Sequence, residues 1–391
     1  MKIGYYLSHP IQYFSPLLSA MNEKFKLQVY YFSDASVKGN FDKGFRLKVK
    51  WDIPLLEGYH YTFLHNLSPR KSLANRFWDV VNPGVITTLV KNRSHVVIVN
   101  GWSYFSTLLT IFISKILGKK IWLRAESPLN QELRKNKLVL FTKKIIFKYL
   151  FFPFINQFLY IGSENKRFLE YYGVSSKKMI YTPYAVDNNY LRQRHLEFSK
   201  NNNLKEKLNL PLDKKVILFV GKFIEKKRPI DLIKAFQQLK NSNSILIMVG
   251  EGELRNEMES YIKSEGINGI ILTGFINQFA IPEYYELCDV FVMCSGMGET
   301  WGLAVNEAMN FEKPIIVSKT CGCSSDLIQE GINGFSFTEG NVSELSFCID
   351  KVLGNEDFCK KAGKASGKII LDFSIDNIVT NLVKAGENMY S

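Results

Sequence analysis

Short runs rich in β-branched and aromatic residues alternate with stretches of helical pattern along the whole chain, and this alternation restricts the fold more than any other feature. In the first half, the predicted strands are residues 2–7, 26–32, 95–99 and 120–124. The rhythm restarts in the second half, with predicted strands at 216–220, 244–249, 269–273, 290–293 and 314–317. Repeated βα units imply a parallel sheet that helices cover on both faces. We therefore predict an α/β fold of two doubly wound, Rossmann-like domains.

The length of the chain also favours two domains. Its 391 residues exceed what one hydrophobic core usually supports. Residues 191–215 are polar and are predicted to be a linker. We expect an N-terminal domain over 1–190, a C-terminal domain over 216–370, and a C-terminal helix over 371–391 that packs back across the domains.

The excess of positive over negative charge lies entirely in the first half. Residues 1–190 contain 27 Lys and Arg against 11 Asp and Glu, whereas the rest contains 23 against 26, for a total of +13. A basic domain of this kind suits an anionic partner, such as a phospholipid surface, a lipid pyrophosphate or an acidic glycan. A lysine-rich proteome is the alternative explanation. No segment resembles a nucleic-acid-binding module, so nucleic acid is not an expected partner.

Cysteine usage and the start of the chain predict a cytoplasmic protein. All six cysteines lie in the second half, in no zinc-binding pattern, and we interpret them as reduced structural thiols. The first ten residues reach polar side chains too early to contain the core of a signal peptide.

Two apolar stretches raise the question of membrane contact. Residues 104–117 are too few to span a bilayer and include Lys115, so we predict a buried crossover helix. Residues 138–160 alternate lysines with phenylalanines. This pattern fits a basic and aromatic face in a headgroup layer, and so a peripheral contact with an anionic membrane. It also fits a core helix whose lysines reach solvent, which is the interpretation we favour from sequence alone.

The run from Gly298 to Glu307 carries the strongest functional signal. Glu299 and Glu307 bracket Gly302 and Leu303, where an apolar run has ended and a helical pattern begins. Carboxylates accept hydrogen bonds from hydroxyls, and the N–H groups at a helix start hold anionic oxygens. The run, which also includes Thr300 and Trp301, therefore predicts a binding site for a nucleotide sugar. The alternative is a pair of surface glutamates that flank a helix start.

A basic loop follows the first predicted strand of the second half. It begins at Gly221, which permits a close backbone approach, and contains Lys222 and Lys227. Both lysines are placed to reach a diphosphate as it gains negative charge on leaving. A solvated surface loop is the other interpretation.

Four motifs in order resemble those of the retaining family 4 glycosyltransferases, which are of the group 1 type and have the GT-B fold. They are the Glu-x7-Glu pair at 299 and 307, G-K-F-I-E-K-K at 221–227, T-P-Y-A-V-D at 182–187 and I-N-G-F at 332–335. The resemblance covers most of the chain. It implies two Rossmann-like domains that face a central cleft, with the acceptor bound by the first domain and the nucleotide sugar by the second.

The resemblance also implies roles for single residues. It puts Glu299 on the hydroxyls of the donor sugar, the N–H groups of Gly302 and Leu303 near that sugar and its phosphate, and Glu307 on the ribose. Lys227 matches a lysine of the family, and Lys222 stands where the family usually has arginine. Lysine keeps the charge but loses the bidentate grip of arginine.

Two residues of the first half are further candidates. His9 follows the first predicted strand and is either a partner of a phosphate or acceptor hydroxyl, as Gln12 also is, or a structural histidine. Glu126 follows the fourth predicted strand, where many relatives carry a histidine near the donor sugar. It is either a base or hydroxyl ligand, or half of a buried structural pair with Arg124. Asn100 and Gly101 are expected to line the same cleft.

The resemblance implies transfer of a sugar from a nucleoside diphosphate sugar, most simply a UDP-sugar, to a hydroxyl of a glycan or lipid-linked acceptor. The anomeric configuration is retained, and the product belongs to a bacterial surface polysaccharide or glycolipid. No D-x-D motif occurs and lysines stand in for a metal, so neither a metal nor a cofactor is expected. The alternatives are a nucleotide-sugar epimerase or phosphorylase of the same fold, and a non-catalytic basic protein that binds membrane or nucleic acid.

Overall fold

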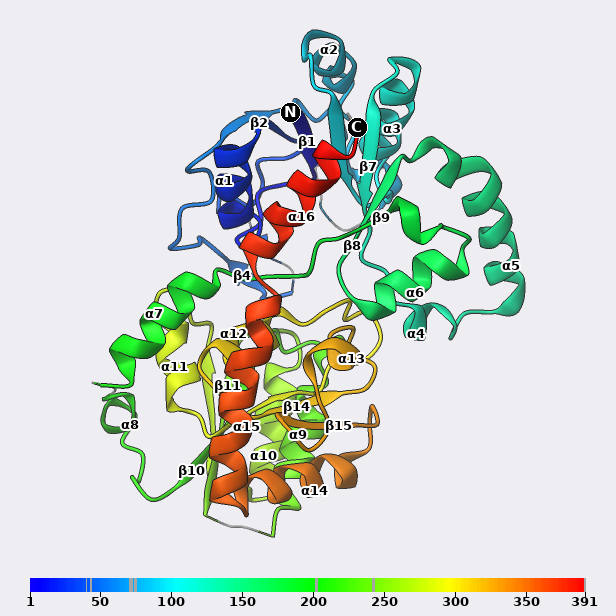
Figure 1. The fold of residues 1–391 in the computed structure, drawn as a ribbon. Helices are drawn as coiled ribbons and strands as arrows, with labels where there is room; N and C mark the ends of the chain where they lie inside the picture. The colour runs from blue at the N-terminus through cyan, green and yellow to red at the C-terminus, as the bar shows by residue number, and fades with distance from the viewer. Residues whose placement is uncertain are drawn as a thin grey trace. The chain divides into compact units, whose positions relative to one another are not determined.

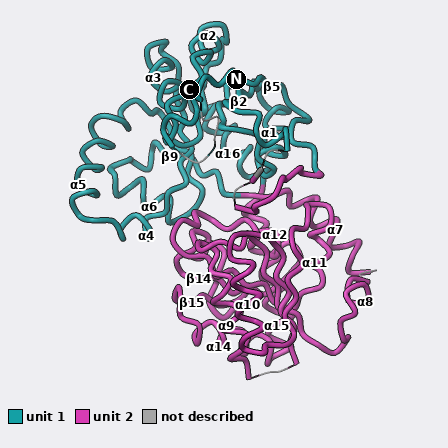
Figure 2. The backbone as a smooth tube through the Cα atoms, turned by 180° about the vertical axis from the view of Figure 1, so that it is seen from behind, with its two compact units in different colours: residues 1–40, 53–184, 375–391 teal, residues 41–52, 185–374 magenta. Residues whose placement is uncertain are grey.

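The computed structural model describes residues 1–39, 41–42, 44–69, 73, 76–200, 203–240 and 243–389. The chain forms two compact units, each with a parallel sheet of its own (Figure 1, Figure 2). Unit 1 contains residues 1–40, 53–184 and 375–391, and unit 2 contains residues 41–52 and 185–374. The segment 41–52 therefore leaves unit 1 and becomes part of unit 2.

Unit 1 is built on a seven-stranded sheet of order β5-β2-β1-β6-β7-β8-β9 with every pair parallel. Its strands are β1 Lys2–Leu7, β2 Lys26–Tyr31, β5 His60–Phe63, β6 Val96–Asn100, β7 Lys120–Arg124, β8 Gln157–Tyr160 and β9 Met179–Tyr181. Its α-helices are α1 Ser15–Lys24, α2 Gly84–Lys91, α3 Phe105–Ile116, α4 Leu129–Glu132, α5 Lys137–Ile145, α6 Ser163–Tyr171 and α16 Ile375–Glu387.

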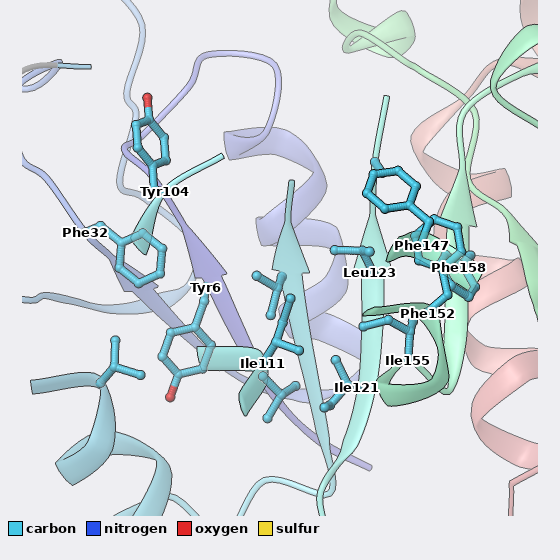
Figure 3. Packing of buried hydrophobic residues seen from close by; sticks show 14 of the residues in the cluster. Tyr6, Phe32, Tyr104, Ile111, Ile121, Leu123, Phe147, Phe152, Ile155 and Phe158 are labelled. Atoms are coloured by element: carbon cyan, nitrogen blue, oxygen red, sulfur yellow. The ribbon is translucent and has the colours of Figure 1, made fainter. Parts of the chain in front are cut away.

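The core of unit 1 is rich in aromatic side chains. Tyr6 of β1 stacks on Tyr30 of β2, with ring centroids 4.7 Å apart. Figure 3 shows Phe147, Phe152 and Phe158 grouped beside β7. Phe147 belongs to a π-helical turn, η2 Ile146–Phe151, that continues directly from α5. The helical segment from 137 to 151 is thus anchored to the sheet through its inner side chains.

Unit 2 has a six-stranded parallel sheet of order β12-β11-β10-β13-β14-β15. The strands are β10 Lys215–Val220, β11 Ser244–Val249, β12 Ile270–Gly274, β13 Val290–Met293, β14 Ile315–Ser318 and β15 Gly334–Phe337, and a small hairpin pairs β3 Phe41–Asp42 with β4 Leu47–Lys48. The helices are α7 Asn188–Phe198, α8 Leu204–Lys207, α9 Pro229–Gln237, α10 Arg255–Ser264, α11 Ile281–Leu287, α12 Leu303–Asn310, α13 Ser324–Leu327, α14 Val342–Leu353 and α15 Glu356–Ile369.

The predicted α/β fold of two doubly wound sheets is confirmed, and all nine predicted strands are present within one or two residues of their bounds. Four further strands of the two sheets, β5, β8, β9 and β15, were not predicted. They are three or four residues long, and none is buried along its whole length, unlike β13 and β14, which are equally short but form continuous buried apolar runs. The predicted crossover helix is α3, but it is buried on one face only, because Phe112 and Ile116 are exposed.

Residues 191–215, predicted to be a linker, include most of α7 and all of α8 and belong to unit 2. Helix α7 begins where Asp187 accepts a hydrogen bond from the N–H of Tyr190. Asn188, which is buried, donates from its side-chain amide to the carbonyl oxygens of Ile370 and Phe373. Most side chains of α7 and α8 are polar, so the composition of the segment did not indicate that Asn188 is buried.

The predicted C-terminal helix is α16, and it is part of unit 1. It lies beside α1, with Met1 so close to Gly386 that a Cβ added there would meet the Met1 Cε at 2.9 Å. Asn381 donates from Nδ2 to the carbonyl oxygen of Tyr181 in β9 at 2.9 Å. The chain therefore returns to its first unit after completing the second.

Candidate functional site

The strand order of unit 2 reverses at one place, and the predicted basic loop and acidic run meet there. β10 pairs with β11 on one side and with β13 on the other. In open parallel sheets, ligands bind beyond the carboxyl ends of the strands at such a switch point. The loop after β10 carries Gly221, Lys222 and Lys227, and the loop after β13 carries Glu299.

Glu299 is almost fully buried and faces two ammonium groups. Its Oε2 forms an ion pair with Lys227 and lies 3.8 Å from the Nζ of Lys226. Burial raises the pKa of Glu299, but the charges of Lys227 and Lys226 outweigh it and hold the pKa below the usual 4.5. The carboxylate is therefore charged at neutral pH. The site presents an acceptor for hydroxyls next to donors for anionic oxygens.

Lys226 was not singled out from the sequence, although it adjoins Lys227 in the basic loop. Its pKa is lowered, first by burial and then, against the attraction of Glu299, by the positive charges of Lys227 and Lys222. The three lysines therefore act on one another electrostatically. A basic cluster of this kind suits a ligand with more than one negative charge, such as a diphosphate.

Lys222 forms an ion pair with Asp42 of the β3–β4 hairpin, which lies in the segment 41–52 of unit 2. Its Nζ lies 2.9 Å from both carboxylate oxygens of Asp42 and 4.6 Å from the ring centroid of Phe45. Phe45 in turn packs edge-on against Phe275, with centroids 5.0 Å apart. Burial raises the pKa of Asp42, but the bonds from Lys222 and from the N–H groups of Phe45 and Gly44 lower it below its usual value.

Gly302 begins α12 in a conformation that requires glycine. Its φ is 109°, and an added Cβ would lie 2.6 Å from the Met293 Sδ and 3.0 Å from the Cys321 Sγ. The first N–H groups of a helix have no partner within the helix, and here they begin at Leu303. A helix start with a glycine before it lets an anionic oxygen approach the backbone closely.

Glu307 and Trp301 are buried, whereas Thr300 is partly exposed. Glu307 is 3% exposed and accepts a hydrogen bond of 2.5 Å from the hydroxyl of Tyr285, a partner that no sequence motif indicated. Trp301 is 2% exposed and donates from its indole to Asn306 at 2.8 Å. Thr300 contributes its backbone to the contact with Gly322. The predicted ligand contacts of Trp301 and Thr300 and the predicted ribose contact of Glu307 stay predictions.

A second acidic group beside the loop after β13 also escaped the sequence analysis. Glu339, beyond β15, accepts hydrogen bonds from the Thr320 hydroxyl at 2.8 Å and from the N–H of Met297 at 3.3 Å. Arg228, at the end of the basic loop, lies 4.0 Å away. Since an isolated glutamate forms no motif, only the fold identifies it.

The sheet of unit 1 reverses between β1 and β6, and the predicted residues of the first half lie after β1, β6 and β7. Gln12 follows β1, and Asn100, before Gly101, ends β6 and accepts from the Tyr5 hydroxyl at 2.9 Å. Glu126 has both oxygens engaged, Oε1 by the Arg124 Nε at 3.2 Å and Oε2 by the Tyr184 hydroxyl at 2.9 Å. The structural pair considered from sequence is therefore present. Glu126 as a catalytic base stays a prediction, and one that this geometry disfavours.

His9 follows β1, next to Ser8, whose Oγ lies 3.0 Å from the imidazole Nδ1. Burial lowers the pKa of His9 from 6.5 to about 4, so the imidazole is neutral at physiological pH. A neutral ring offers one donor and one acceptor and no positive charge.

The depressed pKa of His9 makes part of the stability of the protein depend on pH. The unfolded chain binds a proton at His9 below its ordinary pKa of 6.5, whereas the folded chain does so only near 4. The wild type is therefore expected to lose about 2 kcal/mol more unfolding free energy than His9→Gln as the pH falls between these values. Urea denaturation of both proteins at a series of pH values measures the difference, and parallel losses would contradict the burial of a neutral imidazole.

Comparisons with known proteins identify the class. Residues 200–368 match the model of the family described as glycosyl transferases group 1. An uncharacterized glycosyltransferase of Methanocaldococcus jannaschii is 27% identical over 212 residues, which cover 53% of this chain and 52% of the relative. This chain thus spans about half the length of that relative. The GalNAc-alpha-(1->4)-GalNAc-alpha-(1->3)-diNAcBac-PP-undecaprenol alpha-1,4-N-acetyl-D-galactosaminyltransferase of Campylobacter jejuni is 26% identical over 285 residues, 72% of each protein.

The solved structure of Anabaena HepE in complex with UDP shares the fold, with a TM-score of 0.76 at 17% identity over 99% of this chain and 100% of that one. The fold is therefore the GT-B fold of glycosyltransferases, and the C-terminal residues 200–368 resemble the glycosyl transferases group 1 family. These findings confirm the family type and fold that the motifs indicated. Family 4 membership, retention and metal independence stay predictions.

None of the helices in the described residues is long and apolar enough to cross a membrane. Within the same described ranges, no group of three or more His, Cys, Asp or Glu side chains is placed to hold a metal ion. All six cysteines are free thiols, five of them buried.

Proposed function

We propose that this chain transfers a sugar, with retention of anomeric configuration, from a UDP-sugar to a hydroxyl of a glycan or lipid-linked acceptor. The observation that carries the proposal is the cluster of Glu299, Lys226 and Lys227 at the switch point of unit 2, inside the part of the chain that matches the family. The C. jejuni relative is named for a lipid-linked acceptor, and the Anabaena structure for UDP. Both fit synthesis of a surface polysaccharide or glycolipid.

The chemistry follows from the charges. As the bond between the anomeric carbon and the diphosphate breaks, negative charge grows on the leaving oxygens, and the lysines stabilise it without a metal. Glu299 accepts hydrogen bonds from sugar hydroxyls, and the N–H groups at the start of α12 hold a phosphate oxygen. Neither group forms a covalent bond to the sugar. The acceptor hydroxyl attacks the face that the diphosphate leaves, and the diphosphate takes its proton.

Release of UDP from a panel of UDP-sugars, with and without added glycan acceptors, tests this proposal. We expect one donor to raise the thermal midpoint through ligand binding and to be hydrolysed slowly without acceptor. Product analysis then separates a transferase, which lengthens an acceptor, from an epimerase or phosphorylase. Failure of every UDP-sugar to bind would overturn the donor class, and an inverted product would overturn retention.

The contact between Asp42 and Lys222 places a carboxylate on a lysine that we assign to the diphosphate. Asp42→Asn removes this competing charge, while the amide oxygen still accepts from the N–H groups of Gly44 and Phe45. We expect UDP to bind roughly two- to fivefold more tightly, since exposed ion pairs contribute up to about 1 kcal/mol. Calorimetric titration with UDP measures the change. Asp52→Asn, on the same segment, is the control, and weaker binding by Asp42→Asn would show that Asp42 supports the site.

A further inference from the structure

A helical surface of unit 1 exposes large apolar side chains. Leu138, Phe141, Tyr149 and Leu150 are between 63% and 72% exposed. Val139, Ile145 and Ile146 of the same segment are also exposed. These seven residues, carried by α5 and the η2 turn that continues it, form what we call the α5 surface.

The apolar side chains of the α5 surface are exposed because other side chains of the segment face the core. Lys143, which the sequence would place in solvent, points inward and lies 2.6 Å from the Glu132 Oε1. Its Nζ also lies about 5 Å from the ring centroids of Phe147, Phe168 and Tyr172. The helix therefore turns Lys143 toward the core and Leu138 outward. Leu140 and Phe147 are buried and Lys144 and Lys148 reach solvent, as in the core helix favoured from sequence.

The charge around the α5 surface has one sign. Residues 133–163 contain six basic residues and no aspartate or glutamate. Arg134, Lys137, Lys144 and Lys148 are exposed. Lys144 and Lys148 lie over the rings of Tyr171 and Tyr149, at 4.8 and 5.3 Å from the centroids. Glu132, the carboxylate against Lys143, is buried. Exposed apolar side chains bordered by exposed cations match the boundary between the acyl chains and the headgroups of an anionic bilayer.

The length of the helical segment determines whether it can span a membrane or can only lie at its surface. Residues 137–151 form about four helical turns, too few to cross the hydrocarbon layer. Such a helix lies in the plane of the interface, with its apolar side chains below the headgroups and its lysines level with the phosphates. A tyrosine such as Tyr149 suits this depth, since it has an apolar ring and a polar tip.

We propose that the α5 surface docks the protein on an anionic lipid bilayer. Docking would bring the chain to the bilayer that holds a lipid-linked acceptor, and only this link between docking and the acceptor rests on the proposed function. Docking itself follows from the exposure and charge of α5 and η2. It is therefore measured without any sugar transfer, and it can fail or succeed independently of the donor site.

The test is co-sedimentation of the full chain with vesicles of phosphatidylcholine alone or mixed with phosphatidylglycerol. We expect binding to the mixed vesicles that falls with added salt. The triple variant Leu138→Ser, Phe141→Ser, Leu150→Ser is expected to bind at least about tenfold more weakly. Lys137→Glu with Lys144→Glu is expected to abolish the preference for anionic vesicles. Phe112→Ser with Ile116→Ser on α3, which removes equally exposed apolar groups from the same unit, is the control and is expected to bind like the wild type.

All variants are expected to keep the circular dichroism spectrum and thermal midpoint of the wild type, which shows that they are folded without reference to the donor site. Wild-type protein that stays in the supernatant with mixed vesicles would overturn the proposal. Full binding by the triple variant would overturn it as well. A concentration-dependent dimer that the triple variant abolishes, without vesicle binding by the wild type, would instead assign the α5 surface to a second copy of the chain.

Discussion

Replacing Lys227 by alanine is expected to lower kcat for sugar transfer by about 10²- to 10³-fold, because the ammonium is removed from the place where the leaving diphosphate gains charge. The variant also leaves Glu299 with Lys226 as its remaining close cation, at 3.8 Å. Burial then weighs more in the balance that sets the pKa of Glu299, and the pKa rises. Initial rates of UDP release with a saturating acceptor give kcat, and calorimetry gives the affinity for UDP.

Two matched variants separate charge from structure at this position. Lys227→Arg keeps a cation opposite Glu299 and is expected to retain more activity than Lys227→Ala. Lys263→Ala removes an exposed lysine of α10 and is expected to leave both kcat and UDP affinity unchanged. If Lys227→Ala transfers sugar at the wild-type rate, the leaving group is stabilised elsewhere and the assignment of the basic loop is wrong.

The parts of the fold that could be predicted are those in which the burial of a strand shows directly as an apolar run in the sequence. Strands such as β11 and β13 are buried along their whole length, so they appear in the sequence as continuous apolar runs with sharp ends. The loops after such strands can then be located, and with them Lys227 and Glu299. Because parallel strands bring their carboxyl ends to one edge, the proximity of these two residues followed from topology.

The remaining features depend on contacts that sequence spacing does not record. Asp42 is 180 positions from Lys222, and it lies in a segment that belongs by chain order to the first half but by contacts to unit 2. The hydroxyl of Tyr285 reaches Glu307 from a different helix. The inward position of Lys143 was not predicted, for a similar reason. A lysine is ordinarily expected in solvent, and only the position of Glu132 in the folded unit explains why Lys143 turns inward.

A backbone contact with Gly322 holds the loop that carries Glu299. Changing this glycine tests how far activity depends on the position of the loop. Gly322, after β14, lies against this loop, and a Cβ at position 322 would come within 1.9 Å of the Thr300 carbonyl oxygen. No side-chain rotation relieves that overlap. Gly322→Ala must therefore displace the backbone next to Glu299, and we expect the free energy of unfolding to fall by about 2–4 kcal/mol.

The displaced backbone is also expected to lower kcat about a hundredfold in the Gly322→Ala protein that remains folded, because a shift of roughly 1 Å in a positioning group is costly to catalysis. Gly84→Ala is the control, since a Cβ there has no atom within 4 Å. It is expected to match the wild type in both denaturant midpoint and rate. Equal stability and activity of Gly322→Ala and Gly84→Ala would mean that the Glu299 loop moves without consequence, and that its position is not what confers activity.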